Sequence, residues 1–339
     1  MKSLSGLWLL FLLVFISVLP AKAQMIVVNG LTPDQMVQQL IGNGVQYSNV
    51  TYQGNGIMNG SFNNGSGIGL SEGLVLSSGD VTMIPNNPSV TASGTYNLPG
   101  DADLSALSGE VTHDAAILEF DFIPLGSDLN FNYILASEEY PEYISPEQND
   151  YNDVFGFFLS GPGIVGPYSS PLGFPGGSVN IALIPETPLP VSIFNVNCNV
   201  NPQYYIPNSL DMGDCGSFFV PKVTDDHFVY DGYTTVFTAT YTVVPCSTYH
   251  IKLAVADARD VMLDTGVLLL KNSFSSTPIT LTSNYSVASL DTTMVEGCNS
   301  LTVQFGLDEV TGTPVTIPLS YGGTATNGVD FPLLPPDVT

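Results

Sequence analysis

Short apolar runs recur along most of the chain and predict β-strands. Glycine, proline, asparagine and aspartate cluster between the runs, which is typical of turns and surface loops. The predicted strands cover residues 74–76, 115–122, 131–136, 154–159, 179–184, 234–244, 250–256 and 267–270. Many short strands with little helix predict an all-β fold, a β-sandwich or jelly-roll-like domain.

One short N-terminal helix interrupts this β pattern. Thr32 suits the N-cap, Pro33 suits the first helical position, and Gln35 completes a capping box with Thr32. Apolar residues at i, i+1, i+4 and i+5 from Met36 follow, and Gly42 ends the pattern. The sequence therefore predicts an amphipathic helix that packs against an apolar surface.

Residues 1–23 read as a secretory signal peptide. Lys2 provides the positive start, residues 7–19 form an apolar run broken only by Ser17, and Ala21-Lys22-Ala23 is a small-residue cleavage site. This run is shorter than the ~20 residues that span a bilayer. We therefore expect a secreted, extracellular protein with no membrane insertion after cleavage.

The charge balance excludes several partner classes. Asp and Glu number 31 against 6 Lys and Arg, a formal charge of −25, and loss of Lys2 and Lys22 with the signal would change it to −27. So few bases cannot neutralise a phosphate backbone, which argues against nucleic acid and anionic membranes as partners. A hydrophobic content of 44% provides enough apolar surface for a large core, which argues against a disordered chain.

Several long motifs resemble the choice-of-anchor L domain. They are FNYILASEEYPEY at 131–143, NDVFGFFLSG at 152–161 and HIKLAVAD at 250–257, supported by GLVLSSG at 73–79 and YDGYT at 230–234. That family occurs in secreted bacterial surface proteins, especially of the Bacteroidota, which carry varied C-terminal anchoring signals, often for type IX secretion. The resemblance implies that residues 24–277 form a non-enzymatic structural or adhesion module, attached to the cell surface through a C-terminal region. Its ligand would be a glycan or a protein.

Residues 278–339 resemble the opening half of a Calx-β domain. Val295-Glu296-Gly297 precedes a strand-like run, and GTATNGVDF follows at 323–331. About four strands are too few to close a sandwich. We therefore expect an incomplete Ig-like (Calx-β) sandwich, truncated here, with the rest of a longer chain as its natural partner.

Acidic residues crowd positions 138–153, where no base occurs. The candidate metal ligands are Glu138, Glu139, Asp150 and Asp153, joined by Asp257 if its strand lies nearby. Calcium takes six to eight oxygens, often from loop carboxylates and carbonyls, so calcium is the expected cofactor. A solvated acidic loop is the alternative. A glycosidase pair is disfavoured, because adjacent residues on a strand point to opposite faces.

Other motifs carry less chemistry. The GLSEG stretch at 69–73 matches the G-x-S-x-G nucleophile elbow but lacks its strand and helix, so a glycine-rich turn is the preferred interpretation. The three histidines lack zinc-site spacing.

A carbohydrate-binding module, or an accessory domain of a secreted polysaccharide-degrading hydrolase, remains the rival function. It would expose aromatic residues on one sheet face, for which the candidates are Tyr204, Tyr205, Tyr230 and Tyr233.

The four cysteines are expected to meet an oxidising compartment. Cys198 and Cys215 flank a polar loop and are predicted to form a disulfide. Cys246 and Cys298 either pair with each other or leave Cys298 for a partner beyond this chain.

Overall fold

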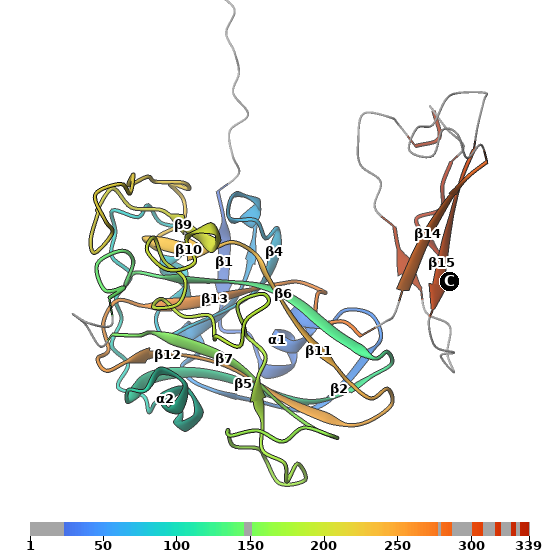
Figure 1. Ribbon diagram of the computed structural model, residues 1–339, viewed down its shortest axis with the longest axis horizontal. Helices are drawn as coiled ribbons and strands as arrows, with labels where there is room; N and C mark the ends of the chain where they lie inside the picture. The colour runs from blue at the N-terminus through green and yellow to red at the C-terminus, as the bar shows by residue number, and fades with distance from the viewer. Residues whose placement is uncertain are drawn as a thin grey trace, which may run out of the picture.

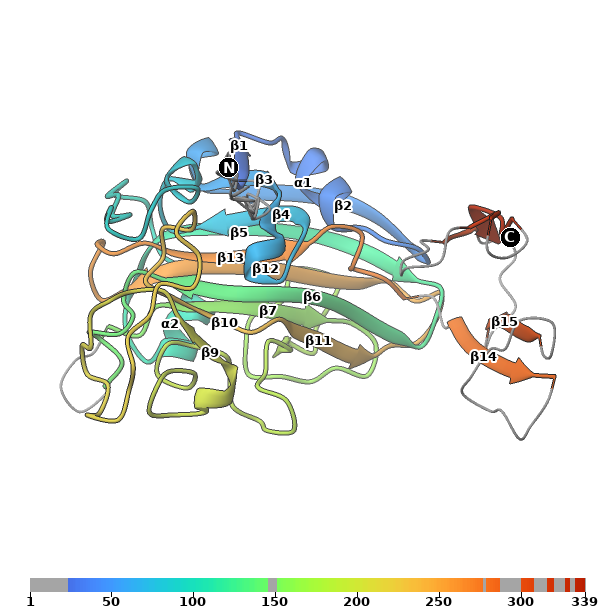
Figure 2. The ribbon, with the colours of Figure 1, turned by 90° about the horizontal axis from the view of Figure 1, so that it is seen from above.

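Two antiparallel sheets stack into a β-sandwich (Figures 1 and 2). The computed structural model describes residues 24–145, 151–276, 279–286, 300–307, 316–319, 327–329 and 333–338. The first sheet has eight strands in the order β1-β3-β4-β13-β6-β10-β9, with β11 also paired to β6, and the second has five in the order β2-β5-β12-β7-β8. The predicted all-β class is confirmed.

The strands and helices have the following bounds. The first sheet contains β1 (Ile26–Asn29), β3 (Asn59–Asn63), β4 (Glu72–Ser77), β6 (Asp128–Ser137), β9 (Tyr205–Pro207), β10 (Gly232–Thr234), β11 (Phe237–Thr242) and β13 (Thr265–Leu270). The second contains β2 (Val45–Gln53), β5 (Thr112–Pro124), β7 (Val154–Ser160), β8 (Val179–Asn180) and β12 (Tyr249–Ala258). The α-helices are α1 (Pro33–Leu40) and α2 (Ala102–Ser108), and short 3₁₀ turns occur at η1 (Gly56–Met58), η2 (Gly65–Ile68), η3 (Val81–Met83) and η4 (Pro202–Tyr204).

Aromatic side chains fill the space between the sheets. Phe131 and Tyr133 of β6 meet Phe157 of β7 with ring centroids 4.8 Å and 4.9 Å apart. All three side chains are fully buried. Alternate residues along each strand face this core, as the two-residue period of a strand requires.

The outer face of each sheet is also covered, which explains why the central strands read as continuous apolar runs. Phe228 and Tyr230 pack with Ile134 of β6 on the outer face of the first sheet. Leu104 of α2 packs with Phe158 of β7 on the outer face of the second. Apolar residues are therefore needed on both sides of the central strands.

The predicted N-terminal helix is confirmed as α1. The Thr32 hydroxyl accepts a hydrogen bond from the Gln35 amide at 3.3 Å, and the Gln35 side chain accepts from the Thr32 amide at 2.9 Å. The apolar stripe packs into the core, with Met36, Val37 and Leu40 fully buried.

A second helix, α2, corrects the expectation of a single helix. Asp101 caps it by accepting from the amides of Asp103 and Leu104, both at 3.0 Å, and Gly109 ends it with φ of 84°. Only Asp103 and Leu104 of this helix are buried, so the sequence carries no amphipathic stripe. A capping aspartate that no helical periodicity follows is typical of a turn, and the sequence therefore predicted a turn here.

Two predicted strands are shorter than expected. The run 234–244 divides between β10 and β11, and of the run 179–184 only β8 is a strand. Strands β1, β2 and β3 were not predicted, because their sequences mix Asn, Gln, Ser, Gly and Thr with isolated apolar residues. Two of these three strands, β1 and β2, lie at sheet edges, where half of the side chains face solvent.

The C-terminal part is described only in pieces. Strands β14 (Ile279–Tyr285) and β15 (Leu301–Leu307) form a hairpin, which Figures 1 and 2 show apart from the sandwich, and β16 (Ile317–Pro318) pairs with β17 (Asp337–Val338). Residues 1–23, 295–297 and most of 323–331 lie outside the described residues. The signal peptide and the truncated Calx-β domain therefore stay predictions.

The predicted disulfide is present. Cys198 and Cys215 are bonded, with their Cα atoms 5.8 Å apart, and Cys215 is buried. Cys246 is an exposed free thiol, whereas Cys298 lies outside the described residues. The bond encloses η4 and β9, within the long segment between β8 and β10.

Candidate cation site at one end of the sandwich

Strand ends from both sheets bring acidic side chains to one end of the sandwich. Glu138 and Glu139 follow β6 directly, and Asp264 precedes β13, whose Thr265 pairs with Ser137 of β6. In the second sheet, Asp153 immediately precedes β7 and Asp257 lies near the end of β12, where Ala256 pairs with Val154. Residues more than one hundred positions apart thus share one end of the fold.

These carboxylates are buried to an unusual degree. Glu138 is 4% exposed, Glu139 2%, Asp264 1%, and Asp153 and Asp257 0%. Acidic side chains are almost never fully buried unless something compensates their charge.

Backbone amides and one hydroxyl satisfy part of the cluster. Glu138 accepts from the Ala92 amide at 2.9 Å and Asp264 accepts from the Gly94 amide at 2.7 Å. Asp153 accepts from the Ala258 amide at 2.9 Å, and its other oxygen lies 2.7 Å from the Thr265 hydroxyl. These contacts hold the three carboxylates in fixed positions.

Four other buried oxygens have no hydrogen-bond partner among the described residues. They are both carboxylate oxygens of Asp257, Oε2 of Glu139 and the amide oxygen of Asn152. The Ser78 hydroxyl lies close enough to Asp257 to lower its pKa, but its hydrogen bonds in the structure are to the carbonyl and the amide of Thr265. Unpartnered buried acceptors cost about 1–3 kcal/mol each, and more when charged.

Burial and mutual repulsion raise the pKa values across the cluster. Burial raises the pKa of Asp153 to about 8 and that of Glu139 to about 10, the latter also through the neighbouring Asp153 charge. The pKa of Glu138 rises to about 9 and that of Asp257 well above its usual range, chiefly by burial. Near neutral pH these groups therefore need either protons or a cation.

Lys252 and Lys271 are engaged at other points of the sandwich, and the base nearest to Asp257 along the chain, Arg259, has its guanidinium 5.6 Å from the centre of the Tyr151 ring. Lys252 pairs with Asp101 and Asp103, and Lys271 pairs with Glu72. Neither lysine compensates the acids of the cluster.

Four of the five predicted ligands lie together at this end: Glu138, Glu139, Asp153 and Asp257. Asp150 lies outside the described residues. Asp264 was considered with Asp257 as an acid that could complete the site, and the structure places it at this end. Asn152 was not predicted as a ligand. The adjacency of the two sheets, which the sequence does not reveal, is what joins these residues.

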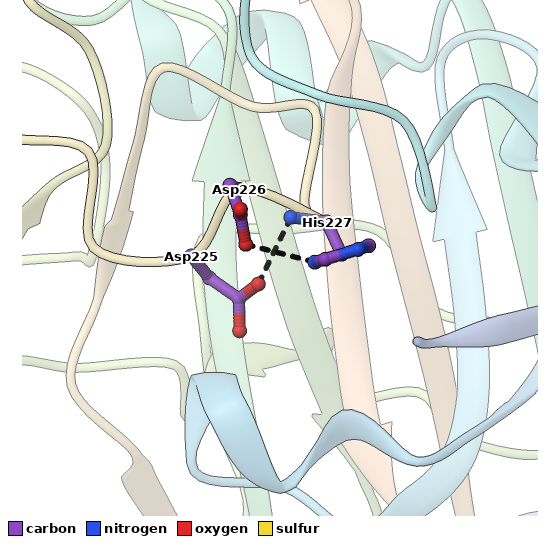
Figure 3. Close-up of side chains that lie close together, drawn as sticks. All are labelled: Asp225, Asp226 and His227. Carbon is purple, nitrogen blue, oxygen red and sulfur yellow. Dashed lines mark hydrogen bonds and ion pairs between the residues drawn. The ribbon is translucent and has the colours of Figure 1, made fainter. Parts of the chain in front are cut away.

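A compact group of possible metal ligands in the described part of the chain lies elsewhere, outside the acidic end. The ligand atoms of Asp225, Asp226 and His227 all lie within 4.8 Å of one another (Figure 3). Asp225 accepts from the His227 amide at 3.0 Å, and Asp226 lies 2.8 Å from the imidazole Nδ1. Because these groups bond one another within a single exposed turn, the contacts explain the turn without a metal.

The four tyrosines considered for a sugar platform do not form one. Tyr205, Tyr230 and Tyr233 are buried. Tyr204 is partly buried and packs on Phe237 with ring centroids 5.2 Å apart. These rings stabilise the core and its covering loops.

Two stacked sheets, a disulfide and an acid-rich end define an all-β sandwich module of the kind found in extracellular proteins. No helix in the described ranges is long and apolar enough to cross a membrane. The chain belongs to the Choice-of-anchor L domain family, whose sequence model matches residues 25–275. This match confirms the family resemblance and makes the protein a cell-surface or extracellular module. No curated protein and no solved structure matches the chain.

Proposed function

We propose that this chain is a non-catalytic structural and adhesion module of a larger surface protein, and that calcium stabilises it at the acidic end of the sandwich. The observation that carries the calcium proposal is the set of buried, unpartnered oxygens on Glu139, Asn152 and Asp257. These oxygens come from the segment after β6, the segment before β7 and the end of β12.

Calcium suits this ligand set better than other common ions. Every candidate donor is a carboxylate or amide oxygen, which hard cations prefer, and calcium tolerates irregular geometry. A divalent charge among Glu139, Asp153 and Asp257 would offset the repulsion that raises their pKa values. Extracellular modules bind calcium at about 10⁻⁴–10⁻³ M, a range that suits a protein outside the cell.

Protonation is the competing way to neutralise the cluster. A carboxylic acid buried without a charge partner can remain neutral at pH 7. In that case the folded protein would lose stability as the pH rises from the ordinary carboxylate pKa of about 4, whether or not calcium is present. The two ways of neutralising the cluster therefore differ in whether the stability of the fold depends on added calcium.

The test is thermal unfolding of the protein with millimolar calcium or with a chelator. We expect the wild type to gain about 1 kcal/mol at a few multiples of Kd, a midpoint rise of about 2–4 °C for a domain of this size. Asp257→Asn should lose this response. In chelator it should be at least as stable as the wild type, because the amide removes a carboxyl group whose burial disfavours its ionised form.

Two further variants serve as controls. Asp128→Asn, at an exposed position at the start of β6, should keep the full calcium response. Asp226→Asn should also keep it, and loss of the response in this variant would assign the metal to the surface turn instead. Equal midpoints with calcium and with chelator in the wild type would overturn the calcium proposal and leave the acids protonated.

The adhesive role rests on the family and on the tail. Choice-of-anchor L proteins are surface modules, and the resemblance of residues 278–339 to a Calx-β domain supports further extracellular modules after the sandwich. We propose that a C-terminal region beyond this chain attaches the protein, through a type IX sorting signal if the source belongs to the Bacteroidota. The complete reading frame tests this, because it must contain further modules and a terminal sorting domain.

A further inference from the structure

The outer face of the second sheet carries a set of polar side chains, here called the polar grid. It comprises Glu119 and Asp121 of β5, Ser160 of β7, and His250 and Lys252 of β12. The register pairs His250 of β12 with Asp121 of β5 on one side and with Ser160 of β7 on the other. Two residues along, Lys252 lies between Glu119 and Phe158 in the same way. The intervening Ile251 faces the core, so the grid residues point away from it.

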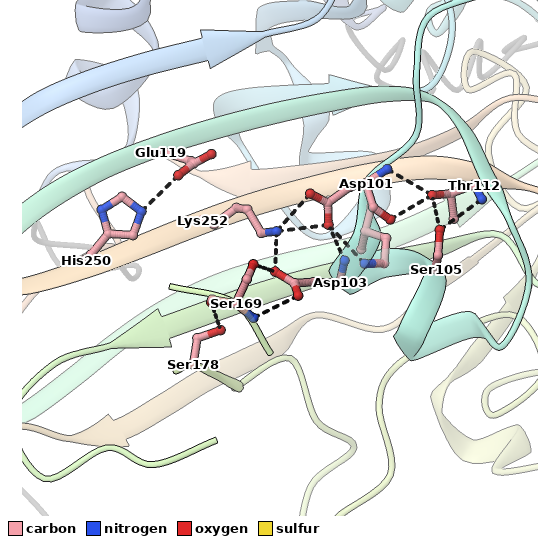
Figure 4. Close-up of polar contacts among 10 residues, drawn as sticks. Asp101, Asp103, Ser105, Thr112, Glu119, Ser169, Ser178, His250 and Lys252 are labelled. Atoms are coloured by element: carbon pink, nitrogen blue, oxygen red, sulfur yellow. Dashed lines mark hydrogen bonds and ion pairs between the residues drawn. The ribbon is translucent and has the colours of Figure 1, made fainter. Parts of the chain in front are cut away.

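The two basic side chains in this grid are held by carboxylates (Figure 4). Lys252 Nζ donates to both oxygens of Asp101 at 2.9 and 2.8 Å and to Asp103 at 2.6 Å. The His250 ring lies 2.8 Å from Asp121 through Nδ1 and 3.0 Å from Glu119 through Nε2. All three lysine protons and both ring nitrogens are therefore engaged within the protein.

A pocket opens between this grid and the loop that follows β7. Its volume is about 260 Å³, and its lining includes Asp101, Glu119, Phe158, Ser160, His250 and Lys252. Ser160 is 1% exposed, and its hydroxyl has no hydrogen-bond partner in the described part of the chain. A buried hydroxyl in a pocket wall, with neither donor nor acceptor used, calls for a partner from outside the protein.

The lining defines what such a partner must offer. The lysine and histidine donors are consumed, whereas the carboxylates keep free lone pairs, so the pocket presents mainly acceptors together with the Ser160 hydroxyl. Asp101 and Glu119 are the carboxylates that line the pocket, and they outnumber the Lys252 charge, which disfavours an anionic ligand. Phe158 is 1% exposed and lies beneath Lys252, whose Nζ is 4.8 Å from the ring centroid. Recognition would therefore use hydrogen bonds from hydroxyl groups rather than stacking.

We propose that this pocket binds one residue of a neutral saccharide, whose hydroxyls donate to the grid carboxylates and pair with Ser160. The ion pairs fix the acceptors before binding, which lowers the entropy lost on association. The site rests on the proposed role of the chain as a ligand-binding surface module. It shares no residue with the acidic end, so calcium dependence and sugar binding can fail separately.

The test is isothermal titration of the whole chain, in calcium, with four neutral hexasaccharides of mannose, glucose (β-1,3 and β-1,4) and xylose, and with hexagalacturonate as the anionic probe. We expect at least one neutral probe to bind and hexagalacturonate not to bind. Ser160→Ala should weaken binding about tenfold, the loss expected for one hydrogen bond. It should leave the thermal midpoint unchanged, because no protein bond is removed.

Ser192→Ala provides the matched control. Ser192 is also 1% exposed with an unpartnered hydroxyl, but it does not line this pocket, so its variant should bind like the wild type. Ser160→Val, which adds bulk to the pocket wall, should abolish binding. Absence of binding by all four neutral probes, equal binding of hexagalacturonate, or unchanged affinity in both Ser160 variants would each overturn the proposal.

Discussion

The hydroxyl of Thr265 lies 2.7 Å from a carboxylate oxygen of Asp153. Thr265 begins β13 in the first sheet, and Asp153 directly precedes β7 in the second. Both side chains are fully buried. This contact joins the two sheets at the acidic end, where oxygens of Glu139 and Asp257 lack a hydrogen-bond partner in the described part of the chain.

Replacing Thr265 with valine should destabilise the sandwich by about 1–3 kcal/mol. Valine keeps the shape of threonine but leaves one Asp153 oxygen buried without its hydroxyl partner. Denaturant unfolding in chelator measures the change without any contribution from calcium. The control is Thr238→Val, which removes a 2.8 Å hydrogen bond to Asn132 at an exposed position and should cost less than about 0.5 kcal/mol. Similar losses in both variants would contradict a special role for Thr265.

The pH dependence of stability should contain a contribution from His250. Burial lowers the pKa of this imidazole, but the hydrogen bonds and charges of Glu119 and Asp121 raise it more, so the net pKa lies above 6.5. A raised pKa means that the stabilisation is fully present below about pH 6.5 and is lost as the pH rises through the folded-state pKa.

The measurement is the free energy of unfolding of wild type and His250→Gln from about pH 5 to about pH 9, with calcium present. We expect the advantage of the wild type to be largest at low pH and to shrink as the pH rises. Taking the difference between the two proteins cancels the titration of the acidic end. A difference that stays constant with pH would show that Glu119 and Asp121 do not stabilise the imidazolium.

Removing the disulfide should cost about 3 kcal/mol, since in the chain-entropy model a closed loop of this size loses about that much in the unfolded state. The bond joins residues 17 positions apart. Unfolding of the Cys198→Ser/Cys215→Ser double variant measures the loss. Cys246→Ser changes an exposed free thiol and should leave stability within about 0.5 kcal/mol. A double variant as stable as the wild type would mean that the loop is ordered by its packing alone.

The GLSEG stretch owes its second glycine to strand packing. A Cβ atom on Gly73 would lie 1.8 Å from the carbonyl oxygen of Leu269 on the paired strand β13. Gly73→Ala should therefore destabilise the fold by about 3 kcal/mol or prevent folding, because backbone must move. Ser71→Ala, at an exposed turn position, should change stability by less than about 0.5 kcal/mol. A large effect at Ser71 with a tolerated Gly73→Ala would contradict this interpretation.

Helix α1 and the central strands could be predicted because their signals are local. The capping box at Thr32 and the apolar stripe after it contain all the information that α1 needs. Strands β5, β7 and β12 are buried on both faces, so burial imposes a continuous apolar run that few other elements produce. Helix α2 and strand β2 were missed because their signals are weaker. Helix α2 has only a cap and one buried leucine, and β2 carries polar residues at alternate exposed positions.

The acidic end was predicted only in part, since its geometry depends on how the sheets stack. The sequence signals a run of acids after residue 138, but it does not reveal that Asp257 lies beside Asp153. The polar grid was missed for a related reason. Glu119, Lys252 and Ser160 are single polar residues within apolar strands, and only the register of three strands brings them together.

The position of β13 has a consequence for the kinetics of folding. This strand lies between β4 and β6, although it follows them by more than one hundred residues. Until residues 265–270 arrive, β4 and β6 each present an open edge in what becomes the middle of the first sheet. Closing such long loops is slow, so the sandwich forms late and cooperatively. A chain emerging through a narrow export channel would thus remain unfolded until nearly all of the module had passed.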